Sequence, residues 1–344
     1  MKQIVYFVPF SEQGLENKLF TPYFNPKANV PPFTFLKSFL KEHDIEVLTI
    51  DFLKDKPADN DMIIVFDHPP VGIYKILHRL RDLVFRKNTF PIKNRRLLKI
   101  LPQFSKKVLV QWESPVNNPW VYKNIKSIVR RYDKSYFIPK ASGFPHFHYP
   151  QNFNSLNEEH FNNSSRKFLI MMNSRMKAKG FWKQELYSER GRALEFFSQY
   201  DEVDLYGSRW NADPSPAIKK IWKGFADDKP KTMSEYKFAL CFENAIWPGY
   251  VTEKIFDCMA VGAIPIYWGA PDIEDDVSVG CFIDMRKFKN YEELRNFLRA
   301  LTSDQIENYR KAICVYFNSE KFKKFTPQYF FETILKIIKD EKNN

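Results

Sequence analysis

The fold is decided by one stretch, residues 237–257, which reads Lys237-Phe-Ala-Leu-Cys-Phe-Glu-Asn-Ala-Ile-Trp-Pro-Gly-Tyr-Val-Thr-Glu-Lys-Ile-Phe-Asp257. Residues 238–242 are apolar on both alternating faces, as expected of a parallel strand covered by helices on both sides. Polar residues begin at Glu243, and a Pro-Gly turn leads to a helix for which Thr252 can serve as N-cap. Together with a second strand at 264–268, the stretch predicts one βαβ unit. Ligands of such sheets bind beyond the carboxyl ends of the strands.

The rest of the chain continues the alternation of strands and helices that indicates open α/β sheets. Expected strands span 4–8, 47–51, 62–67, 108–112, 168–172, 203–206, 238–243, 264–268 and 281–284, and expected helices span 73–86, 182–200, 252–261, 291–301 and 329–338. Around 151–165 the composition changes to Asn, Ser, Glu and His, which is typical of a linker. We therefore expect a first domain at 1–150, a linker at 151–166, a second domain at 167–325 and a C-terminal helical segment at 326–344 that packs back on the first domain.

Composition narrows the class of protein. A chain of 344 residues is long for a single core, so two domains are expected. The net charge of +12 favours anionic partners such as a nucleic acid, an acidic membrane surface or a nucleotide diphosphate. The four cysteines form no CxxC pair or Cys/His cluster, so they are interpreted as buried thiols of a reducing compartment. No signal peptide or long apolar run is present, which predicts a cytoplasmic protein.

Lys254 stands out because it lies in the first turn of the predicted helix. A cation there faces the positive end of the helix dipole, which costs about 0.3–1 kcal/mol unless an anion is present. A bound diphosphate would reverse the sign of this effect. The neighbouring Glu253 could accept hydrogen bonds from ribose hydroxyls. The alternatives are a solvated lysine and an ordinary first-turn carboxylate, and spacing alone does not decide between these readings.

Three segments, 238–244, 248–255 and 264–271, resemble the signature block of the α-1,3/1,4-fucosyltransferases, glycosyltransferase family 10. The resemblance implies a GT-B fold, in which two Rossmann-like domains face each other across a cleft. It also implies that the C-terminal half binds GDP-fucose and that transfer inverts the anomeric configuration. It covers residues 108–116 and 168–271, so acceptor-reading loops within 1–103 cannot be carried over.

The resemblance implies a set of donor-binding residues. Glu253 would lie toward the ribose, and Lys254 and Arg175 toward the diphosphate, although an ordinary surface arginine is the alternative for Arg175. The full implied set is Asn173, Arg175, Glu243, Asn244, Tyr250, Thr252, Glu253 and Lys254.

Glu113 is the candidate general base. It follows an apolar strand in the segment Val108-Leu-Val-Gln-Trp-Glu-Ser-Pro115. A similar Glu-Ser-Pro occurs in the acceptor half of the family, where the Glu is the proposed base. The alternative is a strand-end carboxylate that caps the next turn, and the donor block found in the same chain favours the base.

Three further sequence features are weaker indications of function. Asp59-Asn60-Asp61 has the letters of a metal-binding DxD motif but precedes its strand, so a solvated turn is favoured, and neither a metal nor another cofactor is expected. His146 and His148 are too few for a zinc site and could instead line the acceptor cleft. The basic stretch 79–107 could hold nucleic acid, anionic lipid or only water, and we interpret it as a membrane-surface patch.

These observations predict an inverting α-1,3-fucosyltransferase that uses GDP-fucose. The expected acceptor is a GlcNAc-containing glycan of the N-acetyllactosamine or Lewis type, either an oligosaccharide or a lipid-linked glycan such as lipopolysaccharide, and no nucleic-acid partner is expected. Two alternatives stay open, an inverting GT-B enzyme for another nucleotide sugar and a non-catalytic protein that binds glycans or nucleic acid.

Overall fold

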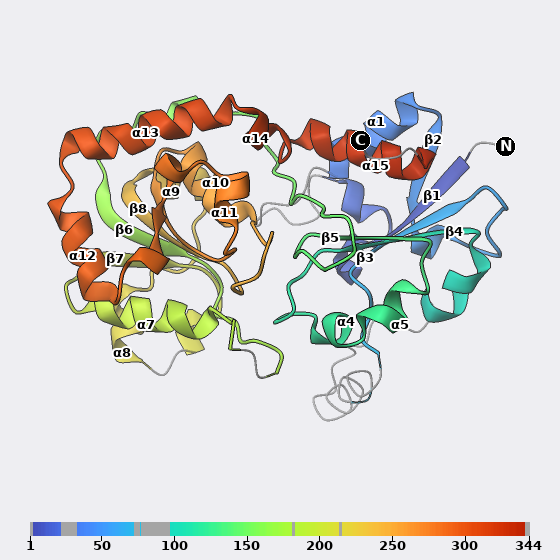
Figure 1. The fold of residues 1–344 in the computed structure, drawn as a ribbon, viewed down its shortest axis with the longest axis horizontal. Helices are drawn as coiled ribbons and strands as arrows, with labels where there is room; N and C mark the ends of the chain where they lie inside the picture. The colour runs from blue at the N-terminus through green and yellow to red at the C-terminus, as the bar shows by residue number, and fades with distance from the viewer. Residues whose placement is uncertain are drawn as a thin grey trace. The chain divides into compact units, whose positions relative to one another are not determined.

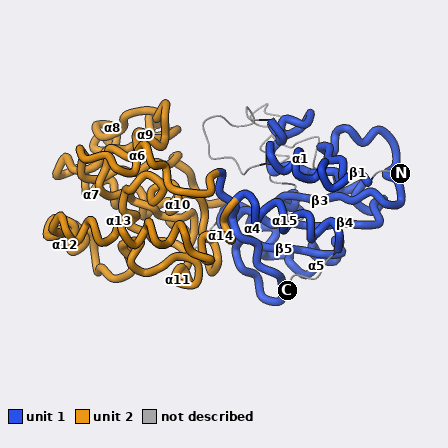
Figure 2. Tube along the Cα trace, turned by 90° about the horizontal axis from the view of Figure 1, so that it is seen from above, with its two compact units in different colours: residues 1–152, 327–344 blue, residues 153–326 orange. Residues whose placement is uncertain are grey.

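The structure is a computed structural model that describes residues 3–21, 33–71, 76, 97–180, 183–212 and 215–340. The chain forms two compact units, coloured separately in Figure 2. Unit 1 contains Met1–Asn152 and Pro327–Asn344, and unit 2 contains Phe153–Thr326. Each unit is built on a parallel sheet of five strands. The expected α/β class with two Rossmann-like sheets is therefore confirmed.

The sheet of unit 1 has the strand order β2-β1-β3-β4-β5. Its strands are β1 (Gln3–Val8), β2 (Ile45–Thr49), β3 (Met62–Phe66), β4 (Lys106–Gln111) and β5 (Lys134–Phe137). The sequence pattern does not predict β5, because its four residues begin with Lys and Ser and contain no apolar run. All residues of β3 are buried, as befits the centre of a covered parallel sheet. The carboxyl ends of β1, β3 and β4 consequently lie side by side at one edge of the sheet.

The last helix of the chain belongs to unit 1. Within the described residues, the helices of this unit whose bounds are given include α1 (Phe33–Glu42), α4 (Pro119–Lys123), α5 (Ile125–Val129) and α15 (Pro327–Lys339). Phe330 of α15 meets Phe33 of α1 with ring centroids 5.4 Å apart, and Phe331 meets Phe39 at 5.5 Å. Beyond α15, Asp340 pairs with Lys134 of β5. The helix expected at 73–86 and the basic residues 79–96 lie outside the described residues, apart from Ile76.

The sheet of unit 2 has the strand order β10-β9-β8-β6-β7. Its strands are β6 (Lys167–Met172), β7 (Val203–Tyr206), β8 (Tyr236–Phe242), β9 (Ile264–Trp268) and β10 (Ile283–Asp284), and its helices are α6 (Glu158–Phe161), α7 (Tyr187–Ser198), α8 (Pro216–Ile221), α9 (Lys229–Ser234), α10 (Glu253–Ala260), α11 (Ile273–Asp276), α12 (Tyr291–Ala300), α13 (Ser303–Phe317) and α14 (Glu320–Lys323). Figure 1 shows α7 and α8 on one side of this sheet and α9, α10 and α13 on the other.

The residues of β8 alternate between these two helical layers. Phe238, Leu240 and Phe242 belong to the hydrophobic cluster that includes α7 and α12. Ala239 and Cys241 belong to the cluster that includes α10 and α13. Each of the five is at most 2% exposed. The apolar run at 238–242 therefore has the cause that the sequence predicts, a strand with both faces covered.

The expected linker 151–166 is wrong from Phe153 onward, because these residues fold into unit 2. Asn157 caps the short helix α6 by accepting from the backbone N–H of His160, and its own N–H donates to the carbonyl of Ala260. Phe161 is 7% exposed within a core cluster of the unit, and Phe153 stacks on Phe317. The asparagines that suggested a linker thus include a capping residue, a role that composition alone does not separate from a loop.

One predicted helix and one predicted strand have different bounds in the structure. The helix expected at 182–200 begins only at Tyr187, and its first expected residue lies outside the described residues. The strand expected at 281–284 is shorter, because a 3-10 turn occupies Val279–Cys281 and only Ile283–Asp284 pairs with β9.

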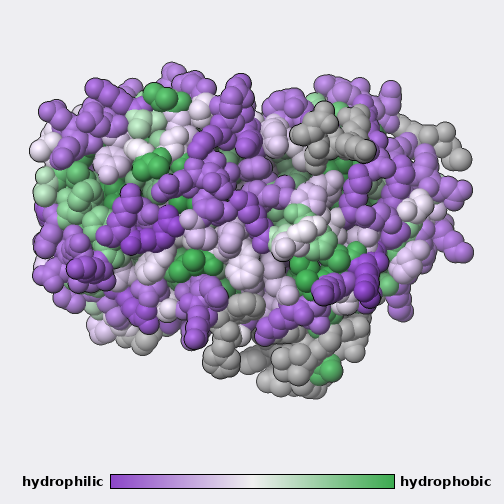
Figure 3. All heavy atoms as spheres, viewed as in Figure 1, coloured by the Kyte–Doolittle hydropathy of each residue, from purple (hydrophilic) through white to green (hydrophobic). Residues whose placement is uncertain are grey.

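The surface is mainly hydrophilic on the face drawn in Figure 3, where apolar residues form small separate patches. Among the described residues, no helix combines the length and the apolar character that crossing a membrane requires. All four cysteines are free thiols; Cys241, Cys258 and Cys281 are buried, and Cys314 is partly exposed.

Candidate active site

The turn between β8 and α10 gathers polar side chains at the carboxyl end of β8. Gly249 adopts a φ of +67°, a conformation that favours glycine, and its N–H donates to the Asp272 carboxylate at 2.8 Å. Thr252 is the N-cap residue of α10, but its side chain makes no capping bond. Its hydroxyl turns instead toward Glu243. The turn therefore brings the start of α10 back over the residues that follow β8.

Glu243 is the centre of the first cluster. It is 0% exposed, and its carboxylate accepts from the Thr252 N–H at 2.8 Å and from the Thr252 hydroxyl at 2.9 Å. The Lys254 Nζ lies 3.1 Å from Glu243 Oε2 and donates to the Thr252 hydroxyl oxygen at 2.8 Å. Burial raises the pKa of Glu243, although Lys254 opposes the shift. Glu243, a member of the implied donor-binding set, is thus the most buried carboxylate of this cluster.

Lys254 is neither solvated nor in need of a ligand to balance its charge. Its side chain is 16% exposed and contacts Glu253 at 3.3 Å as well as Glu243. Burial alone would lower the pKa of Lys254, but the two carboxylates outweigh it and raise the pKa. Burial likewise opposes ionisation of Glu253, yet Lys254 and Lys229 lower its pKa to about 2. The carboxylates of Glu243 and Glu253 therefore balance the charge of Lys254 in the first turn of α10.

The charges continue one turn further along α10, where Asp257 follows Glu253 by four residues. Lys229, at the start of α9, pairs with Asp257. Burial raises the pKa of Asp257 to about 6 in spite of this partner. Lys254 and Lys229 thus pair with three carboxylates, those of Glu243, Glu253 and Asp257.

Arg190 is the residue that sequence reasoning missed. It lies on α7, is 3% exposed, and donates through Nε and Nη2 to the carbonyl of Phe242 at 3.2 and 2.7 Å. Nη2 also donates to Asn244 Oδ1 at 3.0 Å, and Asn244 Nδ2 donates to the Tyr250 hydroxyl at 3.0 Å. A usable signal existed, because Arg190 falls three residues after Tyr187 on the buried side of α7. An arginine at such a position needs buried acceptors.

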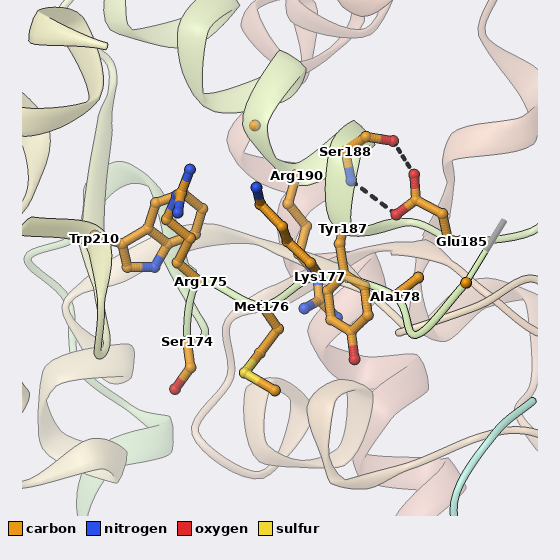
Figure 4. Close-up of a pocket in the computed structure, with 12 residues that line it drawn as sticks. Ser174, Arg175, Met176, Lys177, Ala178, Glu185, Tyr187, Ser188, Arg190 and Trp210 are labelled. Carbon is orange, nitrogen blue, oxygen red and sulfur yellow. Dashed lines mark hydrogen bonds between the residues drawn. The ribbon is translucent and has the colours of Figure 1, made fainter. Parts of the chain in front are cut away.

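A pocket of about 470 Å³ opens beside Arg190 within unit 2 (Figure 4). Its walls come from the loop after β6 and the start of α7, and three of the lining residues, Arg175, Lys177 and Arg190, are cationic. The complete lining is Ser174, Arg175, Met176, Lys177, Ala178, Gly180, Glu185, Tyr187, Ser188, Arg190, Gly191 and Trp210. Glu185 accepts from the N–H of Ser188 at 3.0 Å and so occupies the amino end of α7. The pocket carries an excess of positive charge.

Asn173 does not line this pocket. Its backbone N–H donates to the carbonyl of Tyr206, and its carbonyl accepts from the Trp210 indole at 2.6 Å. Gly207 approaches so closely that a Cβ there would stand 2.1 Å from the Asn173 carbonyl oxygen. Asn173 therefore positions the loop that carries Arg175 through its backbone, and a role for its side chain toward a donor stays a prediction.

Glu113 lies in unit 1, just after β4, and is half-buried. Its Oε2 accepts from Asn117 Nδ2 at 2.6 Å. The backbone N–H groups of Asn117 and Asn118 donate to the carbonyl of Ser114, so the following turn is closed by the main chain. The carboxylate of Glu113 is thus not what closes that turn, which weakens the capping alternative.

The remaining predicted residues lie elsewhere in unit 1. The rings of His146 and His148 are 4.6 Å apart, and His148 meets Tyr329 of α15 edge-on at 6.1 Å. Asp61 accepts backbone N–H bonds at the amino end of β3, which identifies Asp59-Asn60-Asp61 as a structural turn. Within the described part of the chain, no three His, Cys, Asp or Glu side chains converge as a metal site. Metal independence stays a prediction.

Part of the chain matches the model of a known protein family and the sequences of known relatives. The model of the glycosyltransferase family 10 (fucosyltransferase) C-terminal domain matches residues 170–334. The α-(1,3)-fucosyltransferase of Helicobacter pylori is 43% identical over 74 residues, 22% of this chain and 16% of that protein. GDP-fucose protein O-fucosyltransferase 3 of Homo sapiens is 34% identical over 119 residues, 34% of this chain and 25% of that protein. The chain thus aligns with a quarter or less of the length of these relatives.

Solved structures match over nearly the whole chain. A crystal structure of an α-1,3-fucosyltransferase aligns with a TM-score of 0.53 and 16% identity, covering 99% of this chain and 90% of that one. An α-glucosyltransferase in complex with UDP-glucose and DNA aligns with a TM-score of 0.54 and 13% identity, covering 98% and 99%. At such identities the likeness concerns the fold, and it confirms the expected GT-B class.

Proposed function

This chain belongs to glycosyltransferase family 10, whose C-terminal domain occupies its residues 170–334, and on that premise we propose that it is an inverting fucosyltransferase using GDP-fucose. The observation that carries the proposal is that most of the family match, residues 170–326, lies in unit 2. The same residues hold the charged cluster around Glu243 and the cationic pocket beside Arg190. A region matched to a sugar-nucleotide family thus contains the charges that a nucleoside diphosphate requires.

On the donor side, the diphosphate of GDP gains negative charge as the bond to fucose breaks. Arg175, Lys177 and Arg190, which line the pocket, would meet that charge, and Lys254 would support it from the cluster around Glu243. Fixed charges in a site with little water stabilise a developing anion more strongly than charges in solution. We propose that this set replaces a divalent metal, so that transfer continues in excess EDTA.

On the acceptor side, we propose Glu113 as the general base. An acceptor hydroxyl oxygen would form a bond to the anomeric carbon as the bond to GDP breaks, and its proton would pass to the Glu113 carboxylate. A single displacement of this kind inverts the anomeric configuration. General base catalysis of this type contributes about 10²–10⁴-fold in rate. His146 and His148 are proposed to line the acceptor site.

The proposed acceptor is a GlcNAc-containing glycan of the N-acetyllactosamine or Lewis type, free or lipid-linked, with an α-1,3 linkage formed. The names of the relatives differ in linkage and in acceptor. An α-(1,4)-fucosyltransferase of Arabidopsis thaliana is 40% identical over 74 residues, or 22% of this chain. A protein O-fucosyltransferase is also among them. Protein acceptors and a second linkage therefore belong in the test.

The test is incubation with GDP-fucose and a panel of N-acetyllactosamine-type, lacto-type and polypeptide acceptors, with the linkage of the product read by NMR. Calorimetry with GDP and UDP supplies the donor control. If UDP binds as tightly as GDP, the donor is another nucleotide sugar, and if no acceptor turns over, a non-catalytic binding protein is favoured.

Glu113→Gln tests the base separately. Gln preserves size and hydrogen-bonding reach but cannot take the acceptor proton, so kcat should fall by about 10²-fold or more while GDP affinity is unchanged. Glu46→Gln, at an exposed position of β2, is the matched control and should be indistinguishable from wild type. A normal kcat for Glu113→Gln would assign the base to another carboxylate.

A further inference from the structure

Asp67 occupies an unusual position at the carboxyl end of β3. Its φ of +61° lies in the left-handed region. Residues other than glycine adopt this region at a cost in energy, although Asp tolerates it better than most. Its backbone N–H donates to the carbonyl of Val110 on β4 at 3.1 Å. Because β3 and β4 are neighbours, this conformation turns Asp67 toward the residues that follow β4. Strained conformations of this kind concentrate at functional sites.

The Asp67 carboxylate holds the end of β4 by three hydrogen bonds to a single oxygen. Oδ1 accepts from the backbone N–H of Trp112 at 2.9 Å, from the backbone N–H of Glu113 at 2.9 Å and from Gln111 Nε2 at 2.8 Å. Hydrogen bonds to an ionised acceptor are about twice as strong as neutral ones. The peptide group that leads into the candidate base is therefore fixed by a neighbouring strand.

The carbonyl of Glu113 is held as firmly as its N–H. It accepts from Gln111 Nε2 at 3.1 Å and from the Tyr122 hydroxyl at 3.0 Å. Burial, together with the nearby charges of Asp67 and Glu113, raises the pKa of Tyr122 far above its usual value, so its hydroxyl remains a donor. With the backbone of Glu113 fixed, its side chain is oriented by the hydrogen bond that Asn117 Nδ2 donates to Oε2.

We propose that Asp67 is a positioning residue for fucosyl transfer, which fixes the backbone of Glu113 so that its carboxylate meets the acceptor hydroxyl. The inference rests on the proposed role of Glu113 as base. Asp67 itself touches neither donor nor acceptor in this account. Its contribution is geometric, because a displacement of about 1 Å at a reacting group can cost about 10²-fold in rate.

The same strand supplies a matched comparison. Asp61 precedes β3 at its amino end, is 4% exposed, and accepts from the backbone N–H groups of Ile4 at 3.3 Å and Ala58 at 2.9 Å. It resembles Asp67 in residue type, strand and kind of partner. It lies at the edge of the sheet away from Glu113, so its bonds can serve stability alone.

The test uses full-length Asp67→Gly, Asp67→Asn and Asp61→Ala. Glycine removes the carboxylate while suiting the positive φ, so this variant is better able to fold than an alanine variant. Asn keeps an Oδ1 that can accept the same bonds. For each variant we would measure kcat at saturating donor, the KM for GDP-fucose, and Tm.

We expect Asp67→Gly to lose kcat by about 10–10²-fold, with the KM for GDP-fucose changed less than twofold. Asp67→Asn should recover most of the kcat, and Asp61→Ala should lower Tm while kcat stays normal. Normal kcat in Asp67→Gly, or a loss in Asp67→Asn as deep as in Asp67→Gly, would overturn the geometric role. Glu113→Gln separates the two proposals: if it stays active the base is wrong, and if it fails while Asp67→Gly works only the positioning is wrong.

Discussion

Replacing Lys254 with Met tests whether the cluster around Glu243 balances its own charge before any nucleotide binds. Met retains a linear apolar stem but removes the ammonium, which lies 3.1 Å from Glu243 Oε2. Glu243 is 0% exposed, so the variant leaves a buried carboxylate held only by Thr252, or forces it to take a proton. Removing one partner of a buried pair costs about 3–5 kcal/mol. Because 16% of the Lys254 side chain is exposed, we expect about 3 kcal/mol, the lower end of that range.

The assay is urea unfolding of ligand-free protein, compared with the double variant Glu243→Gln/Lys254→Met. The introduced amide can accept from the Thr252 N–H and donate to its hydroxyl oxygen, so the double variant should regain at least half of the lost free energy of unfolding. If Lys254 also supports the diphosphate, both the single and the double variant should bind GDP more weakly than wild type. Wild-type stability for Lys254→Met would refute the reasoning, because it would mean that Glu243 does not depend on this ammonium.

Three further outcomes can be measured. Arg175→Met should weaken GDP binding by about 1.5–3 kcal/mol in calorimetry while changing stability by less than about 0.5 kcal/mol, and an unchanged affinity would remove Arg175 from the donor site. Burial lowers the pKa of His68 to about 4, so the unfolded chain binds more protons between that value and its usual 6.5, and stability falls as the pH drops through this window. At pH 5 the wild-type protein should have lost about 2 kcal/mol of its stability at pH 7, and His68→Gln should lack this loss. Taking the difference between wild type and His68→Gln cancels the opposite trend of Asp257, which both proteins share. An identical pH dependence of stability in wild type and His68→Gln would contradict this assignment. A chromogenic disulfide reagent should label one thiol rapidly in the native protein, Cys314, and all four in denaturant, whereas rapid labelling of Cys241 would contradict its burial.

The sequence was a good guide where one pattern had one cause. The change from an apolar run to polar residues after Phe242 predicted both a buried parallel strand and the place where charged groups gather, because a covered strand can expose polar side chains only beyond its end. The predicted helix directed attention to Lys254, and the resemblance added Glu243. Their partners did not follow from it, since spacing along the chain does not show which oppositely charged groups meet in space.

Arg190 and the segment after Phe153 show the opposite case. An arginine in a helix is usually solvated, and only the folded unit reveals that the carbonyl of Phe242 and the amide of Asn244 provide acceptors for it. An asparagine-rich segment is usually a loop, and only tertiary packing turns Asn157 into a cap. A cytoplasmic location and a membrane contact by the basic stretch 79–107 stay predictions.

The division of the chain has a consequence for biosynthesis. Unit 2 is one continuous segment, whereas unit 1 needs residues from both ends of the chain. The ring of Phe33 is 0% exposed in part because Phe330 covers it, and Phe330 is synthesised almost three hundred residues later. Domains commonly fold as units while the ribosome is still at work. Here unit 2 has its complete sequence once residue 326 has emerged, and the N-terminal sheet waits for the last helix.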